Sequence, residues 1–287
     1  MSRQEALVWG LGMLMLGVGL LQSPGVRAET ANSPFDQAIA SAHRDPANRE
    51  RDRYRHPKET LSFFGLKPDM TVVEIWPAAG WYTEILAPLL RDKGTYYAAT
   101  FMLTADTPEY TRNTQQAFLD KIAKSPDLYD RVKVTQMGAG SLNIAPAGSA
   151  DLVLTFRNVH NWMKAGFAQD AFKAFYQTLK PGGVLGVVEH RAKPGSTPQQ
   201  MIDTGYVTED QVIAYAKEAG LVLEDKSDVN ANPADNKDHP QGVWTLPPGF
   251  ALCRDLKAGP ELDECKGPWQ AIGESDRMTL RFRKPAK

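Results

Sequence analysis

Residues 72–86 have the sequence VVEIWPAAGWYTEIL, and the rest of the chain is arranged around them. The segment begins with apolar residues of high β-propensity, passes through a turn of small residues and ends in the amphipathic pattern of a helix. It therefore predicts a strand, a tight turn and a helix in direct succession. Such a unit directs backbone N–H groups at the helix N-terminus toward whatever binds there.

Strands and helices alternate along the chain after this unit. Further strands are expected at residues 94–101, 132–137, 150–156, 184–189, 221–229 and 278–284, with helices at 108–124, 167–179 and 209–219. Three helices are expected earlier, at 34–42, at 48–55 and a short one that opens at His56-Pro57. This alternation predicts parallel pairing through right-handed crossovers, and hence a doubly wound, mainly parallel α/β sheet of seven strands. A ligand of such a sheet binds outside the C-terminal ends of its strands.

Composition places the chain among ordinary globular proteins. It has 287 residues, of which 42% are hydrophobic, and 33 basic side chains against 34 acidic ones. A net charge this close to zero gives no reason to expect nucleic acid or an anionic membrane as a partner. The expected partner is a small molecule, and the sequence does not indicate an oligomeric state.

The N-terminus has the pattern of a secretory signal peptide. Arg3 precedes an apolar run over residues 7–21, and Val26-Arg27-Ala28 follows as a cleavage site. The alternative, a membrane anchor, needs roughly 20 apolar residues, and this run is shorter. The sequence therefore predicts cleavage after residue 28, export to a periplasm or secretion, and no stable membrane anchoring afterwards.

The two cysteines, Cys253 and Cys265, lie in a loop-rich segment over residues 231–275. In an oxidising compartment the simplest prediction is a disulfide that closes a short loop. A segment of this length without periodicity is typical of a lid or a functional loop. The predicted organisation is a signal peptide (1–28), an N-terminal helical cap (29–70), an α/β core (71–230), this insertion (231–275) and the final strand of the core (276–287).

Glu74 and Gly80 form the frame Glu-x-x-x-x-x-Gly, which resembles the first motif of class I S-adenosylmethionine-dependent methyltransferases. That motif continues from Glu or Asp as x-Gly-x-Gly-x-Gly, and Trp76 and Ala78 stand where its first two glycines would be. Residues 179–183, LKPGG, match a second pattern that many of these enzymes carry before strand five. Over residues 71–229 and the final strand, the chain looks like a small group of exported bacterial predicted methyltransferases.

The resemblance implies S-adenosylmethionine as cofactor. In those enzymes the turn after strand one wraps the methionine part, an acid ending strand two binds the ribose hydroxyls, and an Asp after strand three binds the adenine amine. Here strand two ends without a carboxylate, and strand three ends in Met137-Gly-Ala-Gly. The cofactor-binding residues expected from the resemblance and from position are Glu74, Trp76, Ala78, Gly80, Trp81, Tyr82, Thr100 and Asn158. The three aromatic residues among them could instead stack on a flat or cationic ligand, or belong to the core.

Polar residues also follow strands four and five, at Arg157-Asn-Val-His160 and at Glu189-His190. Arg157, His160 and Glu189 are the predicted catalytic residues. Arg157 would bind a carboxylate or phosphate, and His160 or Glu189 would remove a proton from the methyl acceptor. The histidines lack the local spacing of a metal site, so no metal is expected.

Two functions follow, from different classes. The first is methyl transfer from S-adenosylmethionine to a small molecule, in which the protein mainly positions the reactants. The alternative is a non-catalytic exported ligand-binding protein that keeps the methyltransferase frame with an altered cofactor site. A third possibility is a hydrolase or metal enzyme that uses the histidine and glutamate cluster.

Overall fold

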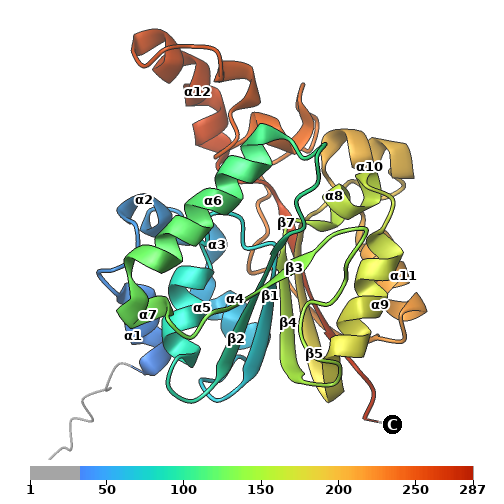
Figure 1. Cartoon of the computed structure of the whole chain (residues 1–287). Coiled ribbons are helices and arrows are strands. Elements are labelled where there is room, and N and C mark those ends of the chain that lie inside the picture. The colour runs from blue at the N-terminus through green and yellow to red at the C-terminus, as the bar shows by residue number, and fades with distance from the viewer. Residues whose placement is uncertain (1–32, 287) are drawn as a thin grey trace, which may run out of the picture. The chain divides into compact units, whose positions relative to one another are not determined.

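The structure is a computed structural model that describes residues 33–286, and within them seven strands form one sheet in the order β3-β2-β1-β4-β5-β7-β6 (Figure 1). β7 is antiparallel to both of its neighbours, and the pairs among β1 to β5 are parallel. The strands are β1 (Thr71–Ile75), β2 (Thr95–Phe101), β3 (Lys133–Met137), β4 (Ala150–Phe156), β5 (Leu179–His190), β6 (Val222–Ser227) and β7 (Arg277–Arg283). The predicted fold class is confirmed.

Helices cover both faces of the sheet (Figure 1). The first group is α1 (Pro34–Ala40), α2 (Pro46–Arg49), α3 (Asp52–Arg55), α4 (Pro57–Phe63), α5 (Thr83–Leu90), α6 (Glu109–Lys124) and α7 (Pro126–Tyr129). The second group is α8 (Val159–Lys164), α9 (Ala168–Thr178), α10 (Pro198–Thr204) and α11 (Glu209–Glu218). Val72 packs in the core beneath α4 and α5, whereas Val73 packs in the core beneath α8 and α9. β1 is therefore buried on both sides, which explains why Val72 and Val73 place apolar side chains on opposite faces.

The sheet order places a crevice at the C-terminal ends of β1 and β4. β1 pairs with β2 on one side and with β4 on the other, so the chain proceeds in opposite directions from this point. Open α/β sheets bind their ligands outside the strand ends at such a switch point. The turn after β1 and the turn after β4 both lie there.

Some predicted boundaries differ from the structure. The helix expected over residues 48–55 is two short helices, α2 and α3, because Arg51 N donates to Asn48 O in a tighter turn between them. β5 begins at Leu179 rather than 184. Its Pro-Gly-Gly segment lies beside the end of the chain, where Gly182 N donates to Lys284 O, and a register shift against β4 accommodates the extra residues.

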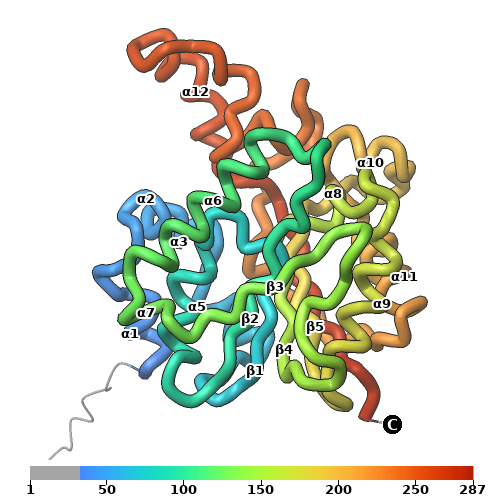
Figure 2. The backbone as a smooth tube through the Cα atoms, viewed as in Figure 1, coloured from blue at the N-terminus to red at the C-terminus, as the bar shows by residue number. Residues whose placement is uncertain are grey.

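The insertion contains helical structure that the sequence does not predict. It holds two 3₁₀ turns, η1 (Gly242–Thr245) and η2 (Ala251–Cys253), and the helix α12 (Pro260–Ile272). No residue of α12 is buried, so the helix has no apolar stripe from which it could have been predicted. Figure 2 shows α12 extending away from the sheet at the edge where the parallel strands end. The predicted disulfide between Cys253 and Cys265 is confirmed and joins η2 to α12.

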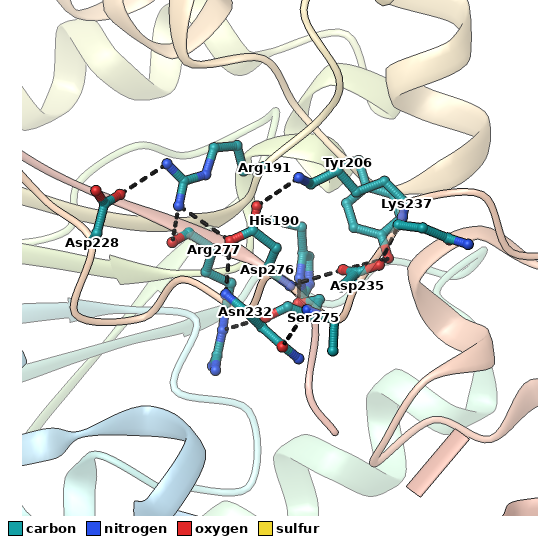
Figure 3. Close-up of polar contacts among 12 residues, drawn as sticks. His190, Arg191, Tyr206, Asp228, Asn232, Asp235, Lys237, Ser275, Asp276 and Arg277 are labelled. Carbon is teal, nitrogen blue, oxygen red and sulfur yellow. Dashed lines mark hydrogen bonds and ion pairs between the residues drawn. The ribbon is translucent and has the colours of Figure 1, made fainter. Parts of the chain in front are cut away.

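A polar network ties the base of the insertion to the sheet (Figure 3). Arg191, just after β5, pairs at 3.1 Å with both Asp228 and Asp276. The buried Asp235 accepts hydrogen bonds from the Tyr206 hydroxyl at 2.9 Å and from the Asp276 backbone N–H at 2.8 Å. These contacts hold the two ends of the insertion together, so its path returns directly to β7.

No helix among residues 33–286 has the length and apolar character needed to cross a bilayer. The predicted signal peptide, residues 1–28, lies outside the described residues and stays a prediction.

Candidate functional site

A cavity of about 720 Å³ lies at the C-terminal ends of β1 to β4. The turn after β1, the ends of β2 and β3, and the segment from β4 into α8 all contribute to its walls. Arg55 from α3, Tyr110 from α6 and Trp244 from η1 close it from other parts of the chain. The cavity therefore occupies the switch point that the topology defines.

The turn after β1 keeps a glycine-type backbone although two of its residues are not glycine. Trp76 has φ of 49° and Ala78 has φ of 51°, while Gly80 has φ of 83°. The left-handed region costs roughly 1–2 kcal/mol for a residue with a Cβ atom. A Cβ at Gly80 would also lie 3.2 Å from the Phe118 ring, so a larger residue there would crowd that side chain. The turn thus has the conformation that the glycine motif predicts, with larger side chains upon it.

The indole of Trp76 lies over the ends of β2 and β3. Its Nε1 donates to the carbonyl oxygen of Met137 at 2.9 Å. Its ring lies 4.8 Å from that of Phe101, 5.8 Å from that of Trp162 and 6.0 Å from that of Phe167, measured between centroids. The side chain that replaces the motif's first glycine is therefore fixed by packing on several sides and by a hydrogen bond.

Glu74 lies at the floor of the cavity and is almost completely buried. One of its oxygens accepts hydrogen bonds from the hydroxyl groups of Tyr96 and Thr83. Burial raises the pKa of Glu74 to about 7, although these two hydrogen bonds and the more distant Lys121 oppose the rise. The Glu74 carboxyl group is therefore already hydrogen-bonded to the buried side chains of Tyr96 and Thr83.

Four arginine side chains gather around one carboxylate beside the cavity. Glu274 accepts from Arg51 at 2.7 Å, from Arg55 at 3.2 Å and from Arg277 at 3.1 Å. Arg157 is 3.9 Å from the same carboxylate. Burial and the nearby Arg55 lower the pKa of Arg157 well below its ordinary value, whereas the arginines outweigh burial and hold the pKa of Glu274 far below its usual range. The site therefore has a surplus of positive charge.

His160 and Glu189 form a separate buried network with His190. One oxygen of Glu189 accepts from the Val159 backbone N–H at 2.6 Å, and the other lies 3.1 Å from His160 Nδ1 and accepts from the His190 backbone N–H at 2.8 Å. His190 Nδ1 contacts the Ser275 hydroxyl. Donor atoms of the two histidines and of Glu189 lie within 4.8 Å of one another, a spacing that a metal ion could bridge. In the described structure both Glu189 oxygens already join the turns after β4 and β5, which is a structural role.

The predicted site residues thus fall into two groups. Those that line the cavity are Glu74, Trp76, Ala78, Trp81, Tyr82, Arg157 and Asn158. Gly80, Thr100, His160 and Glu189 do not line it: Thr100 donates to Thr135 O at 2.9 Å, and His160 and Glu189 are 4% and 0% exposed.

The lining residues that escaped prediction include Arg55, Tyr110 and Trp244, which come from outside the strand ends. Arg55 belongs to a mixed-charge segment, which is the usual pattern of a solvated helix face. Trp244 lies in the insertion, where no periodicity marks it. The one sequence observation that bears on Trp244 is the length of the insertion, which is typical of a lid or a functional loop.

Neither a protein-family model nor a curated protein matches the sequence, but solved structures match the fold. A putative sarcosine dimethylglycine methyltransferase from Galdieria sulphuraria matches with a TM-score of 0.55, 16% identity, and coverage of 82% of this chain and 85% of that one. The 4+2 cyclase SpnF matches with a TM-score of 0.54, 18% identity and 81% coverage of both chains. The fold is that of class I methyltransferases.

A third similar structure is an N-methyltransferase from Haemonchus contortus, in complex with phosphomonomethylethanolamine and S-adenosylhomocysteine. It has a TM-score of 0.52 and 14% identity, and the match covers 89% of this chain and 60% of that one. At these identities the likeness is one of fold. The cyclase among the matches illustrates that function depends on the residues of the site rather than on the fold.

The residues at the methyltransferase cofactor positions do not fit S-adenosylmethionine. The indole of Trp76 covers the ends of β2 and β3, where the resemblance would place the ribose and the adenine. Glu74 is the one carboxylate among the described lining residues, and it is committed to Tyr96 and Thr83. S-adenosylmethionine has a sulfonium and an ammonium group against one carboxylate, so its net positive charge meets a wall that carries Arg55 and Arg157.

Proposed function

We propose that this protein binds a small molecule other than S-adenosylmethionine in the cavity at the strand ends of a methyltransferase fold. This is the ligand-binding alternative that the sequence left open. The observation that carries it is the position of the Trp76 indole, which is held by Met137 O and Phe101 over the ends of β2 and β3. A ligand would lie against this indole instead of replacing it.

The remaining walls support a ligand with a flat or apolar body. Trp81, Tyr82, Phe156 and Trp244 line the cavity together with Trp76. Tyr82 and Phe156 stack with centroids 3.6 Å apart and an interplanar angle of 12°. Aromatic walls bury large areas at a small cost in side-chain entropy, which favours binding of planar or apolar molecules.

A second candidate is methyl transfer from S-adenosylmethionine to a small molecule. The conformation of the turn after β1 favours it, because residues 76, 78 and 80 all keep the left-handed backbone of the glycine motif. In that case Arg157, Asn158 and Asn161 at the cavity wall would orient the acceptor. The near-zero net charge gives no reason to expect a nucleic-acid substrate. With the predicted signal peptide, export to the periplasm is part of either proposal.

Calorimetric titration with S-adenosylhomocysteine separates the two functions. We expect no binding at millimolar ligand to the wild-type protein, shown to be folded by its thermal transition. Trp76→Gly restores the first glycine of the motif and removes the indole, so any gain of binding should occur only in this variant. Trp269→Gly, a change on α12 outside the cavity, is the matched control. Micromolar binding by the wild-type protein would refute the proposal and establish methyl transfer as the working function.

A further inference from the structure

The cavity has a cationic end whose charges are only partly neutralised. Arg55 and Arg157 both line it. Glu274 is already engaged by Arg51, Arg55 and Arg277, and it lies 3.9 Å from Arg157, beyond hydrogen-bond distance. One carboxylate cannot neutralise four guanidinium groups, each of which keeps its proton near neutral pH. A further negative charge at this end of the cavity would be stabilised by every one of them.

Donor groups at this end also lack partners. Arg55 is 2% exposed, and its Nη2 is buried without a hydrogen bond. Within residues 33–286, the Arg157 guanidinium and the Tyr82 hydroxyl donate no hydrogen bond either, and Tyr82 is 5% exposed. Burial raises the pKa of Tyr82 to about 12, so the hydroxyl keeps its proton and remains a donor. A buried donor without a partner is costly, so Arg55 Nη2, with the free Arg157 and Tyr82 donors at the same cavity, indicates a site built for an acceptor.

The backbone at Arg157 adds an independent observation. Arg157 has φ of 64°, a left-handed conformation that a long side chain rarely adopts. Its backbone N–H donates to Val188 O at 2.7 Å, so the end of β4 is fixed in this strained state. Strained residues of this kind are concentrated at binding and catalytic sites, where the surrounding structure holds a side chain in position. Here the strain positions a guanidinium at the cavity wall.

The ring of Tyr82 connects the cationic end to the aromatic walls. The ring stacks on Phe156, and Tyr82 lines the same cavity as Arg55 and Arg157. The Arg55 guanidinium lies 4.7 Å from the centre of the Trp81 ring, which holds its fork in place. Apolar surface and oxyanion donors thus meet at one residue, so one molecule of moderate size could contact both.

We propose that the ligand of this cavity has an oxyanion, a carboxylate or a phosphate group, bound by Arg55, Arg157 and the Tyr82 hydroxyl, with its apolar body against the aromatic walls. The inference rests on the proposed small-molecule function and names the class of ligand. Two oxygens of one such group can accept from both guanidinium groups, because the planar fork of arginine matches the spacing of two oxygens in a carboxylate or a phosphate.

Calorimetry with three matched probes tests the inference: 3-phenylpropanoate, phenyl phosphate and the neutral 3-phenylpropanamide. We expect at least one anion to bind the wild-type protein about ten times more tightly than the amide, since a charge-assisted contact is worth that factor or more. The tighter of the two anions identifies the carboxylate or the phosphate as the group recognised. Equal affinity for the amide and both anions, or no binding of either anion to the folded protein, overturns the inference.

Variants locate the preference. Arg157→Gln should remove most of the anion preference and leave the amide affinity within about twofold, and Tyr82→Phe should weaken only the anions because it removes the hydroxyl and keeps the stacked ring. Arg254→Gln, an exposed arginine of the insertion, should retain the full preference. A preference that survives Arg157→Gln overturns the inference. Titration with S-adenosylhomocysteine, which tests the proposed function, is read separately and does not affect this comparison.

Discussion

Glu74→Gln should stabilise the protein at alkaline pH and much less at acidic pH. Burial raises the pKa of Glu74 from 4.5 to about 7. Between these two values the folded state holds a proton that the unfolded state has lost, so unfolding releases a proton and becomes easier as the pH rises. Each pH unit is worth about 1.4 kcal/mol, which gives a loss of about 3 kcal/mol by about pH 8. Glutamine does not ionise and avoids this loss.

The measurement is urea unfolding of the wild-type protein and the variant, followed by tryptophan fluorescence, at several values between about pH 4.5 and pH 8. We expect the free energy of unfolding of Glu74→Gln, relative to wild type, to rise by about 3 kcal/mol over this range, or roughly 6–12 °C in melting temperature. Other groups titrate in both proteins and cancel in the difference. Glu59→Gln, an exposed change on α4, is the control and should show no such rise.

Two results would refute the reasoning. A difference that does not change with pH would mean that burial leaves the Glu74 carboxyl unperturbed. A difference that falls with pH would mean that the hydrogen bonds from Tyr96 and Thr83 outweigh burial and hold the carboxylate ionised. Either result would also revise the role of Glu74 at the floor of the cavity, since a permanently charged carboxylate there would attract a cation rather than accommodate the proposed anion.

Three further predictions concern other parts of the molecule. Burial and the nearby His160 hold the pKa of His190 well below its ordinary value. Below about pH 6.5 the unfolded state therefore gains a proton that the folded state lacks, and the free energy of unfolding should fall. His190→Asn should flatten that fall in the same urea measurement. Glu189→Gln should cost about 2–4 kcal/mol, because it weakens the bonds to the Val159 and His190 N–H groups, and unchanged stability would contradict the structural role assigned to it. Reduction of the disulfide should speed hydrogen exchange in α12 by up to about a hundredfold. The melting temperature should shift by less than about 2 °C, because no residue of α12 is buried. A large shift in melting temperature would show that the insertion supports the core.

The fold could be predicted because its signals are local. The strand at Val72 to Ile75 and the run over residues 150–156 place apolar side chains on both faces, which is typical of a short strand buried between two helical layers. The Leu-Lys-Pro-Gly-Gly segment marks the change from α9 to β5, because proline and glycine do not continue a helix. The two cysteines are close in sequence, so their pairing required no knowledge of the fold.

The cationic end of the cavity could not be predicted, because its members are brought together by topology alone. Arg55 lies before the sheet, Arg157 follows β4, and Glu274 and Arg277 come from the end of the insertion and the start of β7. In the sequence Arg55 stands among alternating acidic and basic residues, the usual sign of a solvated face. Only the return of the chain at Glu274, more than two hundred residues later, makes it a buried residue of the site.

The packed indole of Trp76 both stabilises the turn after β1 and limits which ligands can bind beside it. Its backbone N–H continues the pairing with β2 by donating to Ala99 O at 2.8 Å, so the left-handed conformation is imposed on whichever residue stands there. Glycine would avoid roughly 1–2 kcal/mol of strain at this position. The indole packs on Phe101 and Phe167 and donates a hydrogen bond to Met137 O. These contacts stabilise the folded state by a free energy similar to or larger than that strain. The indole therefore offsets the strain only while it stays packed over the ends of β2 and β3, and a ligand that displaced it would have to supply that free energy itself. A ligand that binds beside the indole, with its charge at Arg157, does not meet this cost.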